Sequence, residues 1–320
     1  MKRHYIFFLI LFTILGVNSI AQNLGTGVQG GHKNAYTKVE PPSLYKDRVV
    51  LGKTAATSYF QVTYSDSGSK QFTVPEKEAF DHAVDIWGHL LNVNNPNRPI
   101  KILARLKDLG YSSHAGYTLA ECTPASYYNS SNLPNPNTQY PVALAEALLD
   151  QNLNGNNYDM IVTVNSDDSV NWYFGTDGVP EKDKIDFVST ILHEIAHGLG
   201  FTSSFNVQGN IGTKGFDSVQ VDPGKHPTIY DKFTSITDDY PPLYYLTSYN
   251  DMSTTLKNKL TSDNVYFSGD NAWVENGHTL PKLYAPTTWV NGSSITHLDG
   301  YKGQKELVFH FGFKKKYHLK

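Results

Sequence analysis

Residues 186–200 read Asp186-Phe-Val-Ser-Thr-Ile-Leu-His-Glu-Ile-Ala-His-Gly-Leu-Gly200, and this stretch decides the fold. Its apolar side chains recur at helical spacing and form one stripe, made of Phe187, Val188, Ile191, Leu192, Ile195, Ala196 and Leu199. Such a stripe predicts an amphipathic helix with one buried face. Gly198 and Gly200 predict where the helix ends, because glycine readily adopts the left-handed backbone of a helix C-terminus.

The motif His193-Glu194-x-x-His197 lies on this helix, and its histidines stand off the apolar stripe. Residues at i and i+4 lie one turn apart on the same face, so both imidazoles can reach one ion. Neutral imidazoles suit zinc, and Glu194 can take a proton from water bound to the metal. The motif therefore predicts a zinc hydrolase. The alternatives are two histidines that only form hydrogen bonds, and a metal site without catalysis.

The run from His193 to Gly200 resembles the zinc-binding helix of the metzincin metallopeptidases. In that family a third histidine ligand follows shortly after the last glycine, but Ser203 occupies the position here, and a neutral hydroxyl is a poor zinc ligand. The leishmanolysin branch takes its third histidine from a distant segment. Ser294-Ile-Thr-His297-Leu-Asp299 is similar to that segment.

The resemblance implies that His193, His197 and His297 hold Zn²⁺ and that Glu194 is the general base. It extends to secreted bacterial peptidases related to leishmanolysin through three further stretches, residues 172–177, 230–233 and 282–285. Asp217, His226 and His278 remain competing third ligands.

The sequence departs from the family after His297. Where the family has a Leu-Met-x-Pro turn beneath the metal, the chain reads Glu306-Leu-Val308-Phe-His310, and no methionine follows Met252. Val308 then takes the methionine position. Because that methionine is not a ligand, the departure bears more on full activity than on metal binding.

The rest of the chain predicts an α+β class, of the zincin (metzincin-like) type, with a twisted sheet. Apolar and β-branched runs predict strands at residues 59–64, 100–106 and 159–164, and helical spacing predicts helices at 75–91 and 143–149. Residues 110–142 are rich in Tyr, Ser, Asn and Pro and predict a long surface loop. The expected division is an extension (22–54), an N-terminal lobe with the zinc helix (55–200) and a less regular C-terminal lobe with the third ligand (201–320).

Asp150-x-Asn152-x-Asn154-Gly155 matches the opening half of a calcium loop. The closing acid is missing, since the twelfth position is Ile161. An Asn- and Gly-rich turn before a strand is the favoured interpretation.

The amino terminus predicts export. Lys2 and Arg3 precede an apolar stretch over residues 5–17, and Ser19-Ile-Ala21 forms a small-x-small cleavage site. This pattern is typical of a secretory signal peptide, so we expect residues 1–21 to be removed and the mature protein to be secreted, extracellular or periplasmic. Cys122 is the only cysteine, which excludes an intrachain disulfide.

Composition limits the partners. The chain is 39% hydrophobic, enough for a core, and its formal charge of −3 provides no basic face for nucleic acid. After the first 20 residues no apolar run approaches the roughly 18 residues that cross a bilayer, so we expect no membrane span in the mature chain. The oligomeric state is left open.

Together these features predict a secreted zinc-dependent metalloendopeptidase that acts on a protein or peptide substrate. Two alternatives stay open: a secreted binding or adhesion protein that keeps a zincin fold with impaired catalysis, and a zinc hydrolase that does not cleave peptides.

Overall fold

The computed structural model describes residues 59–65, 70–91, 98–112, 116–181, 183–217 and 225–299. The predicted signal peptide, the extension over residues 22–54 and Val308 lie outside these ranges. The interpretations placed on them stay predictions.

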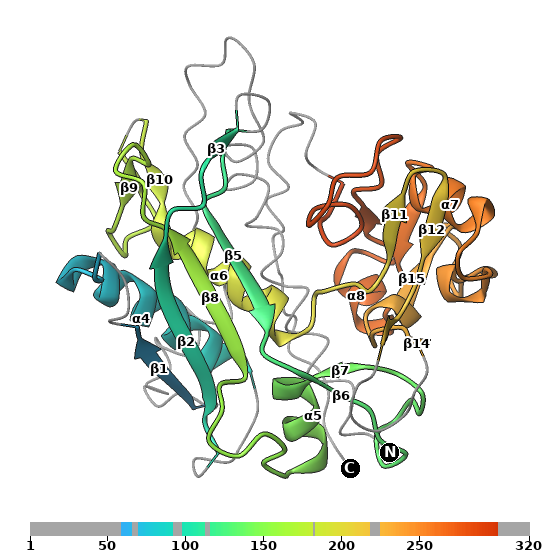
Figure 1. The fold of residues 1–320 in the computed structure, drawn as a ribbon, viewed down its shortest axis with the longest axis horizontal. Helices are drawn as coiled ribbons and strands as arrows, with labels where there is room; N and C mark the ends of the chain where they lie inside the picture. The colour runs from blue at the N-terminus through green and yellow to red at the C-terminus, as the bar shows by residue number, and fades with distance from the viewer. Residues whose placement is uncertain are drawn as a thin grey trace.

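The chain is mixed α+β, as the sequence predicts, and its largest sheet has four strands in the order β1-β2-β8-β5 (Figure 1). The strands are β1 (Phe60–Tyr64), β2 (Ile100–Lys107), β8 (Met160–Asn165) and β5 (Ala120–Pro124). The first three run parallel, whereas β5 pairs antiparallel with β8 and forms an edge. In register, Phe60 pairs with Ile100, Ile102 with Met160, and Ala120 with Val164.

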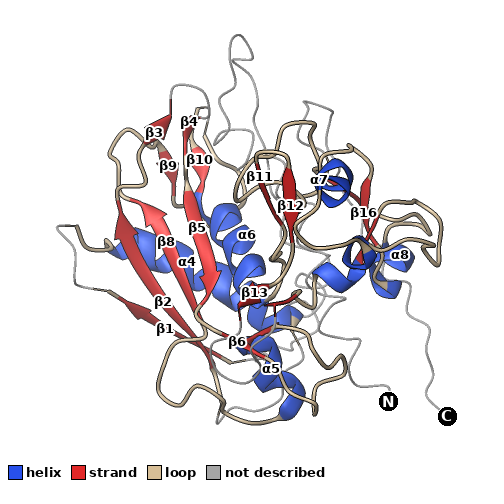
Figure 2. Ribbon diagram, turned by 45° about the vertical axis from the view of Figure 1, so that its right-hand side comes forward, coloured by secondary structure: helices blue, strands red, loops and turns tan. Residues whose placement is uncertain are grey.

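One face of this sheet is packed against helices. Along β2 the buried Ile100, Ile102 and Ala104 alternate with more exposed residues, as expected where successive side chains point to opposite faces. Helices α4 (Val74–Leu90) and α6 (Phe187–Leu199) lie side by side on the packed face (Figures 1 and 2). The sheet and α4 together form the support on which α6 rests.

Helix α4 starts and docks through identifiable contacts. The Glu76 carboxylate accepts hydrogen bonds from the Thr73 backbone N–H at 2.6 Å and the Thr73 hydroxyl at 2.7 Å, which satisfies a donor at the helix start. Pro75 occupies the first turn, where its missing N–H costs nothing. The fully buried Trp87 donates from Nε1 to the Leu192 carbonyl at 3.1 Å, so α4 is fixed directly to α6.

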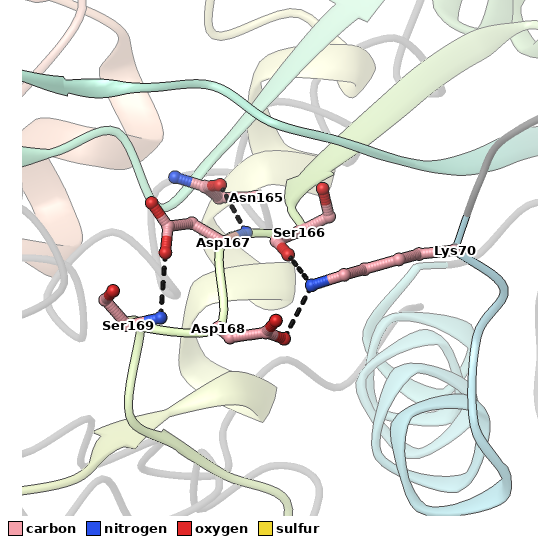
Figure 3. A network of polar contacts seen from close by, with 6 residues as sticks. All are labelled: Lys70, Asn165, Ser166, Asp167, Asp168 and Ser169. Atoms are coloured by element: carbon pink, nitrogen blue, oxygen red, sulfur yellow. Dashed lines mark hydrogen bonds and ion pairs between the residues drawn. The ribbon is translucent and has the colours of Figure 1, made fainter.

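A polar network joins the segment before α4 to the end of β8 (Figure 3). Lys70 Nζ lies 2.6 Å from the Ser166 carbonyl and 2.5 Å from Asp168 Oδ1. The turn is closed by Asn165, whose Oδ1 accepts from the Asp167 N–H at 2.9 Å. Because Lys70 and Asp168 are largely exposed, their ion pair adds little stability, and the network mainly sets the course of the chain.

The prediction of a long loop over residues 110–142 was wrong for residues 120–124. They form β5, whose backbone pairs with β8 from Ala120 to Pro124. Pairing with a buried central strand outweighs a local composition typical of loops. The same segment also contains two short antiparallel strand pairs: β3 (Tyr111–Ser112) with β4 (Gly116–Tyr117), and β6 (Tyr127–Tyr128) with β7 (Tyr140–Pro141).

Helix α5 (Val142–Leu149) follows β7 close to its predicted bounds, and a turn leads from it to β8. In this turn Asn152 Oδ1 accepts from the Gly155 N–H at 2.6 Å, and the Asn154 amide donates to Asp159 Oδ1 at 2.7 Å. Asp150 is ion-paired with Arg98. These contacts are those of the hydrogen-bonded turn that the sequence favours over a calcium loop.

Short elements predominate after α6, as the sequence predicts. They are β11 (Asn206–Gln208), β12 (Ile211–Thr213), β13 (Phe216–Asp217), β14 (Lys225–His226), η2 (Asp231–Phe233), β15 (Thr234–Ser235), η3 (Leu246–Ser248), α7 (Thr254–Leu260), β16 (Val265–Phe267), α8 (Asp270–Glu275) and β17 (Lys282–Leu283). One buried cluster contains residues from both sides of residue 200, from Phe72 to Ile295. The lobe boundaries remain predictions. Among the described residues, no helix combines the length and apolar character needed to cross a bilayer.

Candidate metal centre

Helix α6 begins at a well-formed cap. Asp186 Oδ1 accepts from the Val188 N–H at 3.0 Å and the Ser189 N–H at 3.5 Å, and Oδ2 accepts from the Ser189 hydroxyl at 2.7 Å. Helix N-termini carry N–H groups without intrahelical partners, and an Asp side chain satisfies them. The predicted apolar stripe is buried, with Ile191 and Ile195 fully inaccessible.

We expect Asp186→Ala to lower the free energy of unfolding by about 0.5–2 kcal/mol, the typical cost of a lost N-cap. Asp186→Asn keeps an oxygen acceptor at the same place and should stay near the parent. Urea unfolding of the three proteins measures the effect. Equal losses in the Ala and Asn variants would show that the charge matters and the cap does not.

The C-terminal end of α6 packs very closely on the sheet. A Cβ atom at Gly198 would lie 2.5 Å from Met160 Sδ on β8 and 2.8 Å from Cys122 Sγ on β5. Only glycine permits this approach. Two residues later Gly200 has φ +136°, a conformation that other residues rarely adopt, and it turns the chain away from the sheet.

Three histidines meet beside this helix, although 100 residues separate His197 from His297 in the sequence. The potential ligand atoms of His193, His197 and His297 all lie within 4.8 Å of one another. His193 Nε2 and His197 Nε2 are 3.0 Å apart. The rings of His193 and His297 are stacked with centroids 5.2 Å apart, and the His197 ring is nearly perpendicular to both.

Backbone carbonyls fix the proton on two of these rings. His197 Nδ1 lies 2.7 Å from the Phe201 carbonyl, and His297 Nδ1 lies 2.8 Å from the Ser293 carbonyl. A carbonyl only accepts, so each Nδ1 carries the hydrogen and each neutral ring presents an unprotonated Nε2. Burial lowers the pKa of all three histidines, and that of His297 falls to about 3. The cluster therefore consists of neutral rings near pH 7.

This donor set fits a divalent ion such as zinc. Metal-bound histidines commonly donate their second ring N–H to a carbonyl, as His197 and His297 do here. A tetrahedral zinc with bonds of about 2.0–2.1 Å separates its ligand atoms by about 3.3 Å, close to the 3.0 Å between His193 and His197.

Glu194 lies next to His193 in sequence and points toward β5. Its buried carboxylate accepts a hydrogen bond from the Cys122 backbone N–H. Burial, aided by the charge of Glu121, raises the pKa of Glu194 to about 8, while the Cys122 N–H opposes this rise. The sequence predicts Glu194 as a candidate base, but it gives no signal for the backbone group of Cys122 that orients the carboxylate.

Ser203 is bonded to an acidic side chain of a later segment. Its hydroxyl donates to Asp231 Oδ1 at 2.5 Å. The fully buried Asp231 also accepts from the Ser204 N–H at 3.0 Å, the Ser204 hydroxyl at 2.6 Å and the Thr228 N–H at 2.9 Å. Asp231 thus anchors the chain just after α6, a role that sequence analysis missed because nothing local marks it.

The other candidate third ligands lie elsewhere. Asp217 and His226 are on the paired strands β13 and β14. The His278 ring packs edge-on against Trp273 at a centroid distance of 4.3 Å. Within the described residues, the histidines able to share an ion are His193, His197 and His297.

The fold and this cluster define an α+β protein in which His193 and His197 of helix α6 meet His297 from a distant turn. The profile of the SPBPB7E8-like family matches residues 35–266, well over half of the chain, so the chain belongs to that family. The description of the family names no activity, and the matched range ends before His297. No curated protein and no solved structure matches the chain.

Proposed function

We propose that the chain is a secreted zinc-dependent metalloendopeptidase of the zincin, metzincin-like type. The observation that carries the proposal is the convergence of three histidine rings, two of which, His193 and His197, lie on the helix that also carries Glu194. The signal-peptide pattern of residues 1–21 supports secretion.

His193, His197 and His297 would hold the ion. Zinc bound there would polarise the scissile carbonyl and lower the pKa of a coordinated water from 15.7 to about 7. The carbonyl partners of His197 and His297 keep the two rings in the tautomer that binds. Three protein ligands leave a fourth position open, the arrangement of catalytic zinc sites.

Glu194 is the proposed general base, and it returns the proton to the leaving amine as the peptide bond breaks. Its carboxylate is held by the Cys122 N–H, so it is oriented before substrate arrives. A dipositive ion beside this carboxyl favours its ionised form, which counters the effect of burial on the pKa.

Strand β5 supports a peptide as the substrate. It is the edge of the four-stranded sheet, and its central residue Cys122 contacts Glu194. An extended peptide can add to a sheet edge through main-chain hydrogen bonds, independent of its sequence. A peptide bound in this way lies next to the proposed base.

The test is metal analysis of the exported protein together with cleavage of casein. We expect one zinc per chain, cleavage of casein, loss of cleavage after chelation, and recovery when zinc is restored. Zinc without cleavage of casein or of non-peptide esters would favour the binding or adhesion protein. Zinc with activity only on non-peptide substrates would favour the second alternative, a zinc hydrolase that does not cleave peptides. Absence of zinc would reject the proposal.

A further inference from the structure

Tyr230 connects the centre of the core to the turn that carries His297. Its ring is fully buried against Phe201 and Phe267, with centroid distances of 4.6 and 5.2 Å. Its hydroxyl donates to the Ile295 carbonyl at 2.5 Å, across 65 residues of sequence. The packed ring thus holds the Tyr230 hydroxyl against the backbone of Ile295, two residues before His297.

The acceptor residue has an unusual backbone. Ile295 is fully buried and β-branched, yet its φ is +60°. A β-branched side chain in this region is a genuine outlier, a strained conformation that persists only where the surroundings enforce it. The Ile295 N–H donates to the Tyr284 carbonyl at 2.6 Å, so both backbone polar groups of Ile295 are held from outside the turn.

The conformation of Ile295 determines where His297 points. The Tyr284 N–H donates to the His297 carbonyl at 2.8 Å, and the His297 ring donates to the Ser293 carbonyl on the other side of Ile295. Rotation of the Ile295 backbone toward an ordinary φ would move Ser293 and His297 relative to each other. The ring would then lose the carbonyl that sets its tautomer and orientation.

We propose that Tyr230 is a positioning residue for the metal centre: its hydroxyl holds Ile295 in the strained conformation that aims His297 at His193 and His197. The inference rests on the proposed function, because it takes the cluster to be a metal site. Groups that orient metal ligands without touching the metal typically contribute about 10–100-fold in metal affinity. Tyr230→Phe should therefore weaken metal binding by about 10-fold or more while the fold is kept.

The test uses the mature protein, Tyr230→Phe, and the control Tyr140→Phe. Tyr140 is also buried, and its hydroxyl accepts from the Asn135 N–H at 3.0 Å, outside the three-histidine cluster. Titration of each metal-free protein with Co²⁺, followed by visible absorption, gives affinity and ligand environment. We expect Tyr230→Phe to bind about 10-fold more weakly or worse and with an altered spectrum, and Tyr140→Phe to match the parent.

A second measurement needs no metal. Diethyl pyrocarbonate acylates accessible neutral histidines. His297 is only 8% exposed, so the rate of its labelling, mapped by mass spectrometry, reports whether the ring keeps its buried position. Faster labelling of His297 in Tyr230→Phe alone supports the inference. Unchanged Co²⁺ affinity and unchanged labelling overturn it. A parent protein that fails to bind Co²⁺ rejects the proposed metal centre, and labelling then decides the role of Tyr230 by itself.

Discussion

Glu194→Gln is expected to lower the rate of peptide cleavage by about 100- to 10,000-fold, the usual contribution of a general base. The amide is nearly the size of the carboxylate, but it cannot take a proton from water near pH 7. The Glu194 carboxylate accepts from the Cys122 N–H, and the amide oxygen can accept the same bond. Zinc content and the free energy of unfolding should therefore stay close to those of the parent.

Glu275→Gln is the matched control, since burial also raises the pKa of this glutamate and it belongs to helix α8, away from α6 in sequence. It should cleave casein at the parental rate. If Glu194→Gln does so as well, Glu194 is not the base and the proposed mechanism is wrong. If the parent holds zinc but is inactive, Val308→Met is the first change to try, because the metzincin resemblance predicts a methionine at that position.

His297→Ala is expected to lower zinc affinity by more than roughly 10–100-fold. That range is the usual effect of losing a group that only hydrogen-bonds to a metal ligand, whereas this change removes a proposed ligand itself. The substitution leaves His193 and His197 as a two-histidine site, and two ligands compete poorly for the ion. Equilibrium dialysis against a zinc buffer measures the change. His297 is only 8% exposed, so its loss can also destabilise the fold, and urea unfolding of both proteins separates lost stability from lost affinity.

His278→Ala and His226→Ala are the controls for this prediction. The His278 ring packs on Trp273, and His226 lies on β14, so neither change should reduce zinc affinity. Full zinc retention in His297→Ala, or loss in either control, would mean that a different residue completes the site.

The sequence predicts helix α6 and its histidine pair well because both depend on local spacing. The 3.6-residue period gives the buried stripe, and i, i+4 spacing brings His193 and His197 together whatever the rest of the fold. His297 could be suggested only by a resemblance, since no local pattern connects residues 100 positions apart. The structure brings it to the pair, while its role as a ligand stays a prediction.

The missed features all depend on contacts distant in sequence. Strand β5 has loop-like composition and is a strand because β8 lies beside it. Asp231 looks like an ordinary surface acid until the fold surrounds it with Ser203, Ser204 and Thr228. Tyr230 and Ile295 likewise gain their roles from pairing across 65 residues.

The adjacency of Tyr230 and Asp231 has a consequence for biosynthesis. One residue holds the turn before His297 and the next holds the chain after α6, so both sides of the histidine cluster depend on one short segment. A growing chain that has emerged only as far as residue 290 contains the helix and this segment but lacks His297. Long-range contacts of this kind form late in folding. A chain that stops short of residue 297 therefore lacks one histidine of the cluster, and the proposed peptidase activity would be absent from it while its unfolded segments are exposed to cleavage.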